Sequence, residues 1–294
     1  MGRGSLPVRQ ALRAATAAQD PTRREVLRSG LQSLGASTAV VIGSASLNFG
    51  IGLGLGLGLG LGFGLGADVA QAQSPTASST RRFTGRATHA ETGQWLYTEE
   101  HQQVLRDGRW WGGTIRYVSP TGELLAEKTL DFSQDRFIPL ARTVFKTGGV
   151  EERITKINPQ SVTMETVREG RTKTREVERS PVMAADSGFH AFIQARLEDL
   201  LAGQTVNLAF GVISQQTTFK FRIRRTAQRT VGTQRHVVLV AEPDSLLRLV
   251  ADPLTLVYDE RTRDLLEYQG LSNLDDPATG KPPKVRITYQ FADA

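Results

Sequence analysis

From Phe83 onward, short segments of alternating apolar and polar residues follow one another, separated by turn sequences. In the clearest of them, Phe219, Phe221 and Ile223 alternate with charged residues. Side chains of a β-strand point to opposite faces with a period of two, so such a segment buries one face and leaves the other in water. Pairs such as Asp107-Gly108 favour tight hairpin turns between the segments. The pattern therefore predicts a single, mainly β domain over residues 83–294, with neighbouring strands antiparallel.

The turns bound a series of expected strands. Arg171–Glu178 is almost wholly charged, which indicates a solvated strand or a strand at a sheet edge. Leu246–Val250 is expected to form a short helical turn. The expected strands are Thr84–Glu91, Gln94–Arg106, Arg109–Val118, Glu123–Phe132, Glu151–Ile157, Ser161–Arg168, Arg171–Glu178, Thr205–Ile213, Thr217–Thr226, Thr230–Glu242, Leu254–Asp259, Leu265–Gly270 and Val285–Phe291.

One segment has the period of a helix. Between Phe189 and Leu201 the apolar residues fall at i, i+3, i+4, i+8, i+11 and i+12, which makes one stripe on a helix. Asp186 or Ser187 is placed to cap its start, and Gly203 to end it. The expected fold is an antiparallel curved sheet or half-barrel with this long amphipathic helix packed across its concave face. Such curvature leaves a space that side chains or a ligand must fill.

The N-terminal segment, residues 1–72, has a different character. The run Thr22-Arg23-Arg24-Glu25-Val26-Leu27-Arg28 resembles the twin-arginine export motif, with Val26 where phenylalanine is usual. No charged residue follows between Arg28 and Asp68, and residues 50–66 alternate glycine with apolar residues, mostly leucine. Glycine disfavours a helix by about 1 kcal/mol per residue relative to alanine, so this is a poor permanent membrane helix. We expect residues 1–72 to be an export signal.

Small residues at Ala70 and Ala72 match the two positions that signal peptidase reads, so cleavage is expected before Gln73. Residues 73–82 are small and polar and are expected to form a flexible leader. The expected partners of the signal are the twin-arginine export machinery and signal peptidase, and the expected location is the periplasm. An uncleaved inner-membrane anchor is the alternative, and an accidental Arg-Arg pair in a low-complexity tail is a further one.

Charge and cysteine content exclude several classes of function. The chain has a formal charge of +6, but much of this excess belongs to the expected signal, which holds six arginines against three acidic side chains. The rest of the chain is close to balanced, and so small an excess argues against nucleic-acid binding, which needs a dense basic face. The absence of cysteine from the sequence excludes disulfides, thiolate metal sites and cysteine nucleophiles.

Residues 95–291 resemble a family of uncharacterised exported envelope proteins and, more distantly, the lipoprotein-carrier half-barrels of the periplasm. The resemblance rests on Tyr97 with Glu100-His101, on Ala126–Phe132, and on Asp186–Phe189 at the expected helix start. It also rests on Phe221-Arg222, Leu246–Arg248, Leu256–Asp259 and Tyr268–Asn273. It implies a location and an architecture, and it implies no activity.

Aromatic residues on the expected strands are candidates for ligand contact. Those chosen are Trp95, Tyr97, Phe219, Phe221, Tyr258 and Tyr268. Aromatic and aliphatic side chains line most small-molecule pockets, but the same residues are equally typical of a core.

Glu100 and His101 are the candidate polar cluster. Adjacent strand residues point to opposite faces, so the two side chains would not act together without help, and structural or surface roles are the plainer interpretation. None of the four histidines is paired at metal-ligand spacing, so no metal site and no cofactor are expected. No serine-hydrolase motif is present either, so no catalytic residue is assigned.

The sequence therefore favours a periplasmic binding or carrier module for an apolar or lipid-like ligand. An envelope scaffold or assembly protein with a filled core is the alternative, and a hydrolase ranks third. A pocket lined by aromatic and aliphatic side chains favours the first, a solid core the second, and converging polar groups in a cleft the third.

Overall fold

The computed structural model describes residues 77–244 and 253–291. Within these residues fifteen strands form one sheet, in the order β8-β7-β6-β5-β4-β3-β2-β1-β15-β14-β13-β12-β11-β10-β9. Every neighbouring pair is antiparallel except β9 and β10. The predicted mainly β, antiparallel class is confirmed.

The strands of the N-terminal half are β1 (Ser78–His89), β2 (Trp95–Arg106), β3 (Arg109–Val118), β4 (Leu124–Asp131), β5 (Leu140–Phe145), β6 (Glu151–Ile157), β7 (Ser161–Arg168), β8 (Arg171–Glu178) and β9 (Met183–Ala185). Two helices follow, α3 (Gly188–Ala195) and α4 (Leu197–Leu201). The remaining elements are β10 (Val206–Val212), the 3₁₀ turn η1 (Ile213–Gln215), β11 (Thr217–Val231), β12 (Gln234–Pro243), β13 (Leu254–Asp259), β14 (Leu265–Leu271) and β15 (Lys284–Phe291).

Most expected strands are found, and those of the β6–β8 meander have the predicted bounds. β5 and β9 were not expected. β9 has only three residues, too few to show a period, and in β5 the apolar residues form the pairs Leu140-Ala141 and Val144-Phe145, which do not alternate. β1 begins at Ser78, which pairs with Arg106 of β2, so residues 78–82 of the expected leader lie in a strand.

The break expected between Thr226 and Thr230 is a β-bulge inside β11. The register between β11 and β12 shifts at Arg225/Ala227, and the true turn follows Val231, where Gly232 has a φ of +60°. A bulge interrupts the alternation without ending the strand, and it increases the local twist. Further shifts at Ala87/Thr88, Val104/Leu105 and Tyr117/Val118 act in the same way on β1–β4.

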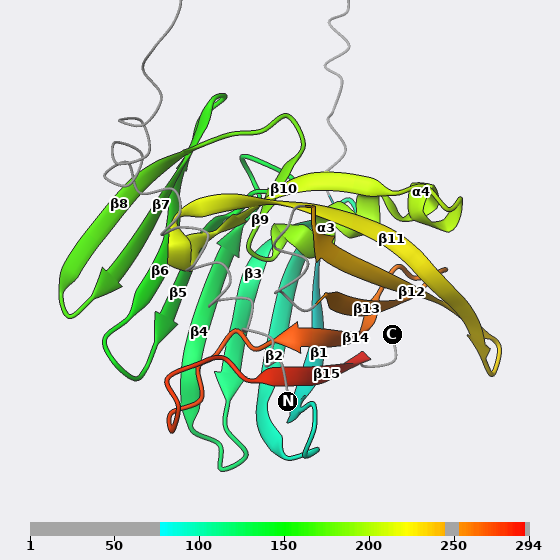
Figure 1. Ribbon diagram of the computed structural model, residues 1–294, viewed down its shortest axis with the longest axis horizontal. Helices are drawn as coiled ribbons and strands as arrows, with labels where there is room; N and C mark the ends of the chain where they lie inside the picture. Colours follow the sequence, from blue (N-terminus) through cyan, green and yellow to red (C-terminus); the bar gives the residue numbers. More distant parts are fainter. Residues whose placement is uncertain (1–76, 245–252, 292–294) are drawn as a thin grey trace, which may run out of the picture. The chain divides into compact units, whose positions relative to one another are not determined.

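The sheet curves strongly and is not closed. In Figure 1 strands β2–β8 lie roughly upright on the page, while β11–β15 cross it, and α3 lies between these two halves. β1 joins the halves by pairing with β15 from Phe83↔Phe291 to His89↔Val285. β8 and β9 end the strand order, and β8 has the exposed, charged character expected of an edge.

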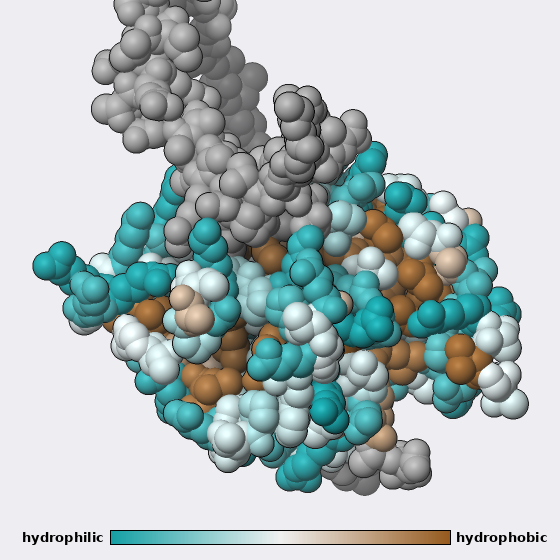
Figure 2. Space-filling model, turned by 60° about the horizontal axis from the view of Figure 1, so that its bottom comes forward, coloured by the Kyte–Doolittle hydropathy of each residue, from teal (hydrophilic) through white to brown (hydrophobic). Residues whose placement is uncertain are grey.

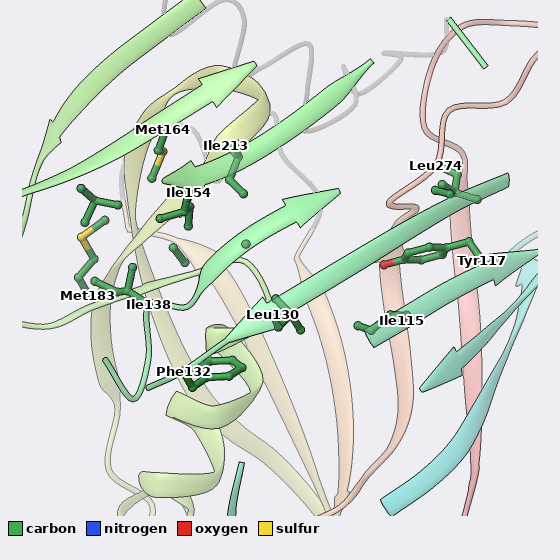
Figure 3. Packing of buried hydrophobic residues seen from close by; sticks show 14 of the residues in the cluster. Ile115, Tyr117, Leu130, Phe132, Ile138, Ile154, Met164, Met183, Ile213 and Leu274 are labelled. Atoms are coloured by element: carbon green, nitrogen blue, oxygen red, sulfur yellow. The ribbon is translucent and has the colours of Figure 1, made fainter. Parts of the chain in front are cut away.

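The inner face carries two clusters of buried apolar residues. One has members on β1–β10 and β15, and Figure 3 shows Ile115, Leu130 and Ile154 among them. The other joins the two helices to β10–β13, with Ile193, Leu200 and Leu239 at its centre. The inner face of the curved sheet is therefore packed as a core at two places.

The single long helix expected over Phe189–Leu201 is not found, since the segment forms the two short helices α3 and α4. At Arg196 the backbone has φ −106° and ψ 9°, and its N–H bonds to the carbonyls of both Phe192 and Ile193. The apolar stripe is buried on both sides of this break, which explains why its periodicity looked continuous. Gly203, with a φ of +84°, follows α4 as predicted.

α3 begins in close contact with the loop before β5. A Cβ atom on Gly188 would lie 1.8 Å from the Phe137 carbonyl oxygen, so glycine is required there. That carbonyl also accepts the Ala185 N–H at 3.0 Å. The Phe137 carbonyl therefore connects the loop before β5 with β9 and with the first residue of α3.

Within 77–244 and 253–291 no helix combines the length and apolar character needed to cross a membrane. The expected export signal, Arg23, Arg24, Ala70 and Ala72 included, lies outside the described residues, as does the helical turn expected at Leu246–Val250.

Candidate functional site

A cavity of about 340 Å³ lies on the concave face of the sheet. Side chains from β1–β6, β10–β15 and the start of α3 line it, and its surface is mostly apolar. Figure 2 shows apolar surface between and beneath rows of polar side chains. The volume is within the range of about 300–1,000 Å³ that small-molecule sites usually occupy.

The six aromatic candidates separate into three groups. Phe221, Tyr258 and Tyr268 line the cavity. Phe219 packs into the core beside the helices, and Tyr97 is buried with its hydroxyl 3.1 Å from Ser272 Oγ.

Trp95 lies on the other face of the sheet, with the Arg86 guanidinium 4.6 Å from its ring centroid. The register shift at Ala87/Thr88 leaves Leu96 as an extra residue between Trp95 and Tyr97. A bulge of this kind reverses the side-chain alternation. Trp95, a candidate for ligand contact, therefore does not share the inner face with Tyr97.

The polar pair in the cavity is Glu99 with His101, rather than Glu100 with His101. Glu100 points outward and pairs with Arg116 at 2.7 Å, both side chains being nearly half exposed. Glu99 is only 2% exposed, and its Oε2 lies 3.0 Å from His101 Nε2. The signal that identifies this pair is the i, i+2 spacing, which puts two strand residues on one face.

A third residue from far along the chain completes the cluster. Tyr289 of β15 donates its hydroxyl hydrogen bond to Glu99 Oε2 at 3.1 Å. A carboxylate only accepts hydrogen bonds, so with Glu99 ionised the His101 Nε2 must donate. Nδ1 is then an acceptor in the neutral form of the ring and a donor in the protonated form.

His101 Nδ1 is buried and has no hydrogen-bond partner among the described residues. The ring is held by stacking on Phe83, with centroids 4.3 Å apart and planes at 11°, and by an edge contact with Tyr289. Buried polar atoms nearly always have partners, so this one is an exception that needs an explanation.

The Glu99 carboxylate affects the pKa of four tyrosine hydroxyls. Burial raises the pKa of Tyr97, Tyr117, Tyr268 and Tyr289, and the Glu99 carboxylate raises each further. All four hydroxyls therefore stay protonated at neutral pH, and none of them places a charge near Glu99.

Two ion pairs form other parts of the cavity wall. Arg81 binds Asp264 through two hydrogen bonds of 2.6 Å, and Lys128 Nζ lies 2.8 Å from both oxygens of Asp186. Burial alone would raise the pKa of Asp186, but the Lys128 charge and hydrogen bonds from Lys128 and Ser187 outweigh it and hold that pKa below its usual value. Asp186, expected as a possible helix cap, is instead a member of this ion pair.

His190 of α3 is a second imidazole in the wall. Its Nδ1 lies 3.0 Å from the Tyr258 hydroxyl, and the two rings stack with their planes at 13°. Burial lowers the pKa of His190 to about 4. This imidazole is therefore uncharged at neutral pH.

No protein-family model matches the chain, and no curated protein matches it. One similar solved structure is a "Beta-barrel-like Protein of Domain of Unknown Function DUF1849" from Brucella abortus. It has a TM-score of 0.47 and 7% identity, over 73% of this chain and 98% of that one. Another is a DUF1329 family protein from Desulfovibrio piger, with a TM-score of 0.24 and 9% identity, over 74% of this chain and 85% of that one. Neither brings residue roles to this chain.

Proposed function

We propose that the chain is a binding or carrier module that holds an amphiphilic, lipid-like small molecule in the cavity of its concave face. The observation that carries the proposal is the cavity itself, about 340 Å³ of mostly apolar space that the core leaves open. A filled scaffold core would instead bring its side chains into contact at native packing density. Apolar walls would take the body of the ligand, and the Glu99 cluster its polar end.

A cavity-filling variant tests this function. Thr143 is buried in the wall, and Thr143→Phe would put an aromatic ring into the space. We expect the affinity for an apolar fluorescent probe such as N-phenyl-1-naphthylamine to fall by about tenfold or more, equivalent to about 1.4 kcal/mol. Fluorescence titration of the purified protein measures the change.

Thr129→Phe is the matched control. Thr129 lies on the adjacent strand β4, pairs with Arg142, and is exposed on the outer face. The Thr129→Phe variant makes the same chemical change outside the cavity, so probe affinity should stay within about twofold of that of the unaltered protein. Equal effects of the two variants, or no probe binding to the unaltered protein, would favour the scaffold alternative. Circular dichroism shows whether each variant is folded.

We also propose that the chain is exported through the twin-arginine route and works in the periplasm. The support is the Arg23-Arg24 motif, the uncharged stretch after it, and the Ala70/Ala72 pattern. N-terminal sequencing of the secreted product should begin at Gln73, and a double Arg23→Lys, Arg24→Lys variant should accumulate as uncleaved precursor in the cytoplasm. A secreted product that retains residues 50–66 would instead indicate a membrane anchor.

A further inference from the structure

The hairpin of β11 and β12 extends beyond the rest of the sheet. β10 pairs with β11 only as far as Ile223, and β13 pairs with β12 only from His236 onward. Between these points, within the described residues, the two strands pair with each other and with no third strand. Figure 1 shows them passing the ends of the neighbouring strands. We call this segment, residues 224–235, the arm, and every residue from 226 to 235 is exposed.

The arm and the part of β11 before it carry charge of one sign. Residues 217–241 contain no acidic side chain and six basic ones, which are Lys220, Arg222, Arg224, Arg225, Arg229 and Arg235. Among the described residues only two carboxylates, those of Glu242 and Glu260, form ion pairs with this group, at 2.7 to 3.5 Å. The group therefore has a surplus of positive charge, in a domain whose charges are otherwise close to balanced.

The basic side chains lie on both faces of the arm, and its tip is apolar. Arg229 and Arg235 belong to adjacent residue pairs of the β11–β12 ladder, so their side chains point to opposite faces. Val231, in the last pair before the turn, is 52% exposed. A protein partner would cover one face of such a ribbon, whereas a lipid surface surrounds a tip that enters it.

We infer that the arm docks on an anionic phospholipid surface, with Val231 in the interfacial region and the arginines at the phosphate groups. The negative surface potential of such a bilayer attracts basic residues, and guanidinium groups bind phosphate through paired hydrogen bonds. Burial of the apolar tip among the lipid head groups adds to this attraction. The inference goes beyond the proposed function, since no residue of the arm lines the cavity.

Vesicle sedimentation tests the charge requirement. The purified protein is mixed with vesicles of phosphatidylcholine, with or without phosphatidylglycerol, at low and high salt. We expect binding only where phosphatidylglycerol is present, and weaker binding at high salt because salt screens exposed charges. A double variant, Arg225→Gln with Arg229→Gln, should bind these vesicles about tenfold more weakly.

The matched control removes two basic charges from another exposed strand. Arg171 and Arg175 lie on β8, where both side chains are exposed. The double variant Arg171→Gln with Arg175→Gln should keep its affinity for the same vesicles within about twofold, because it leaves the arm unchanged. Circular dichroism shows whether each variant is folded.

A tryptophan at the tip tests insertion directly. Val231→Trp should show a blue shift of tryptophan emission when vesicles with phosphatidylglycerol are added, because the indole leaves water for the interface. Val182→Trp is the matched control, since Val182 is 48% exposed in the segment between β8 and β9. Its emission should change no more than that of the unaltered protein.

Four results would overturn the inference. They are no binding to any vesicle, equal binding with and without phosphatidylglycerol, equal affinities of the arm and β8 variants, and vesicle binding without a shift in Val231→Trp. Binding to polyglutamate but to no vesicle would indicate an acidic protein partner instead. The arm variant should bind N-phenyl-1-naphthylamine as the unaltered protein does, so failure of the docking inference is distinguishable from failure of the proposed function.

Discussion

Replacing Lys128 with methionine is expected to lower the free energy of unfolding by about 3 kcal/mol, the lower end of the usual cost of breaking a buried ion pair on one side. The side chains of Lys128 and Asp186 are only 10% and 9% exposed, and removing the lysine leaves a buried carboxylate without its cation. We use the lower end of this range of destabilisation because Lys128 and Asp186 line the cavity. Urea denaturation followed by circular dichroism measures the change.

Arg116→Met is the matched control, because Arg116 pairs with Glu100 on the outer face with both side chains nearly half exposed. Exposed pairs contribute about 0–1 kcal/mol, so this variant should be close to the unaltered protein. Adding Asp186→Asn to Lys128→Met should restore part of the lost stability, since the amide removes the unpaired charge and asparagine tolerates the positive φ of 49° at this position. Equal destabilisation by Lys128→Met and Arg116→Met would show that burial of the inner pair is unimportant.

Acidification from pH 7 to pH 5 is expected to cost about 2 kcal/mol of stability through His190 alone, because its pKa differs between the folded and unfolded states. The pKa of this imidazole is about 4 in the folded protein and 6.5 as its ordinary value. The unfolded state therefore binds the proton more readily, and stability falls as the pH drops from 6.5 towards 4. The magnitude follows because each unit of difference in pKa corresponds to about 1.4 kcal/mol.

His190→Gln should remove most of this dependence between pH 7 and pH 5, because glutamine does not titrate. His89→Gln, at the last residue of β1, is the control and should retain the slope. Asp186, whose folded pKa is lowered, loses its contribution only below its ordinary value of 3.8, outside the window. Urea denaturation at several pH values measures both variants, and an unchanged slope in His190→Gln would refute the assignment.

The sequence alone predicted the local β structure well. In β6–β8 the observed bounds are those predicted, because side-chain patterns and turn sequences are properties of neighbouring residues. The same reasoning failed at Arg225/Ala227, where a bulge mimics a turn, and at Arg196, where a helix break leaves the apolar stripe intact. Bulges and helix breaks depend on the surfaces against which a segment packs.

The candidate site was predicted only in part. Phe221, Tyr258, Tyr268 and His101 were selected from the sequence and line the cavity, whereas the carboxylate beside His101 belongs to Glu99. The i, i+2 rule identifies which residues share a face with His101, but it does not say which face becomes concave. Tyr289 was not selected, because it reaches Glu99 only through the pairing of β1 with both β2 and β15.

By itself the sequence determined the strands, their two faces and most of their turns, because these depend on side-chain alternation and on backbone preferences within a few residues. The tertiary structure alone decided which face lies inside the curve and which distant side chains meet there. Lys128 with Asp186, Arg81 with Asp264 and Glu99 with Tyr289 are brought together by the bending of the sheet and the pairing of β1 with β15. That bending results from the summed twist and bulges of many strands, which no local pattern specifies.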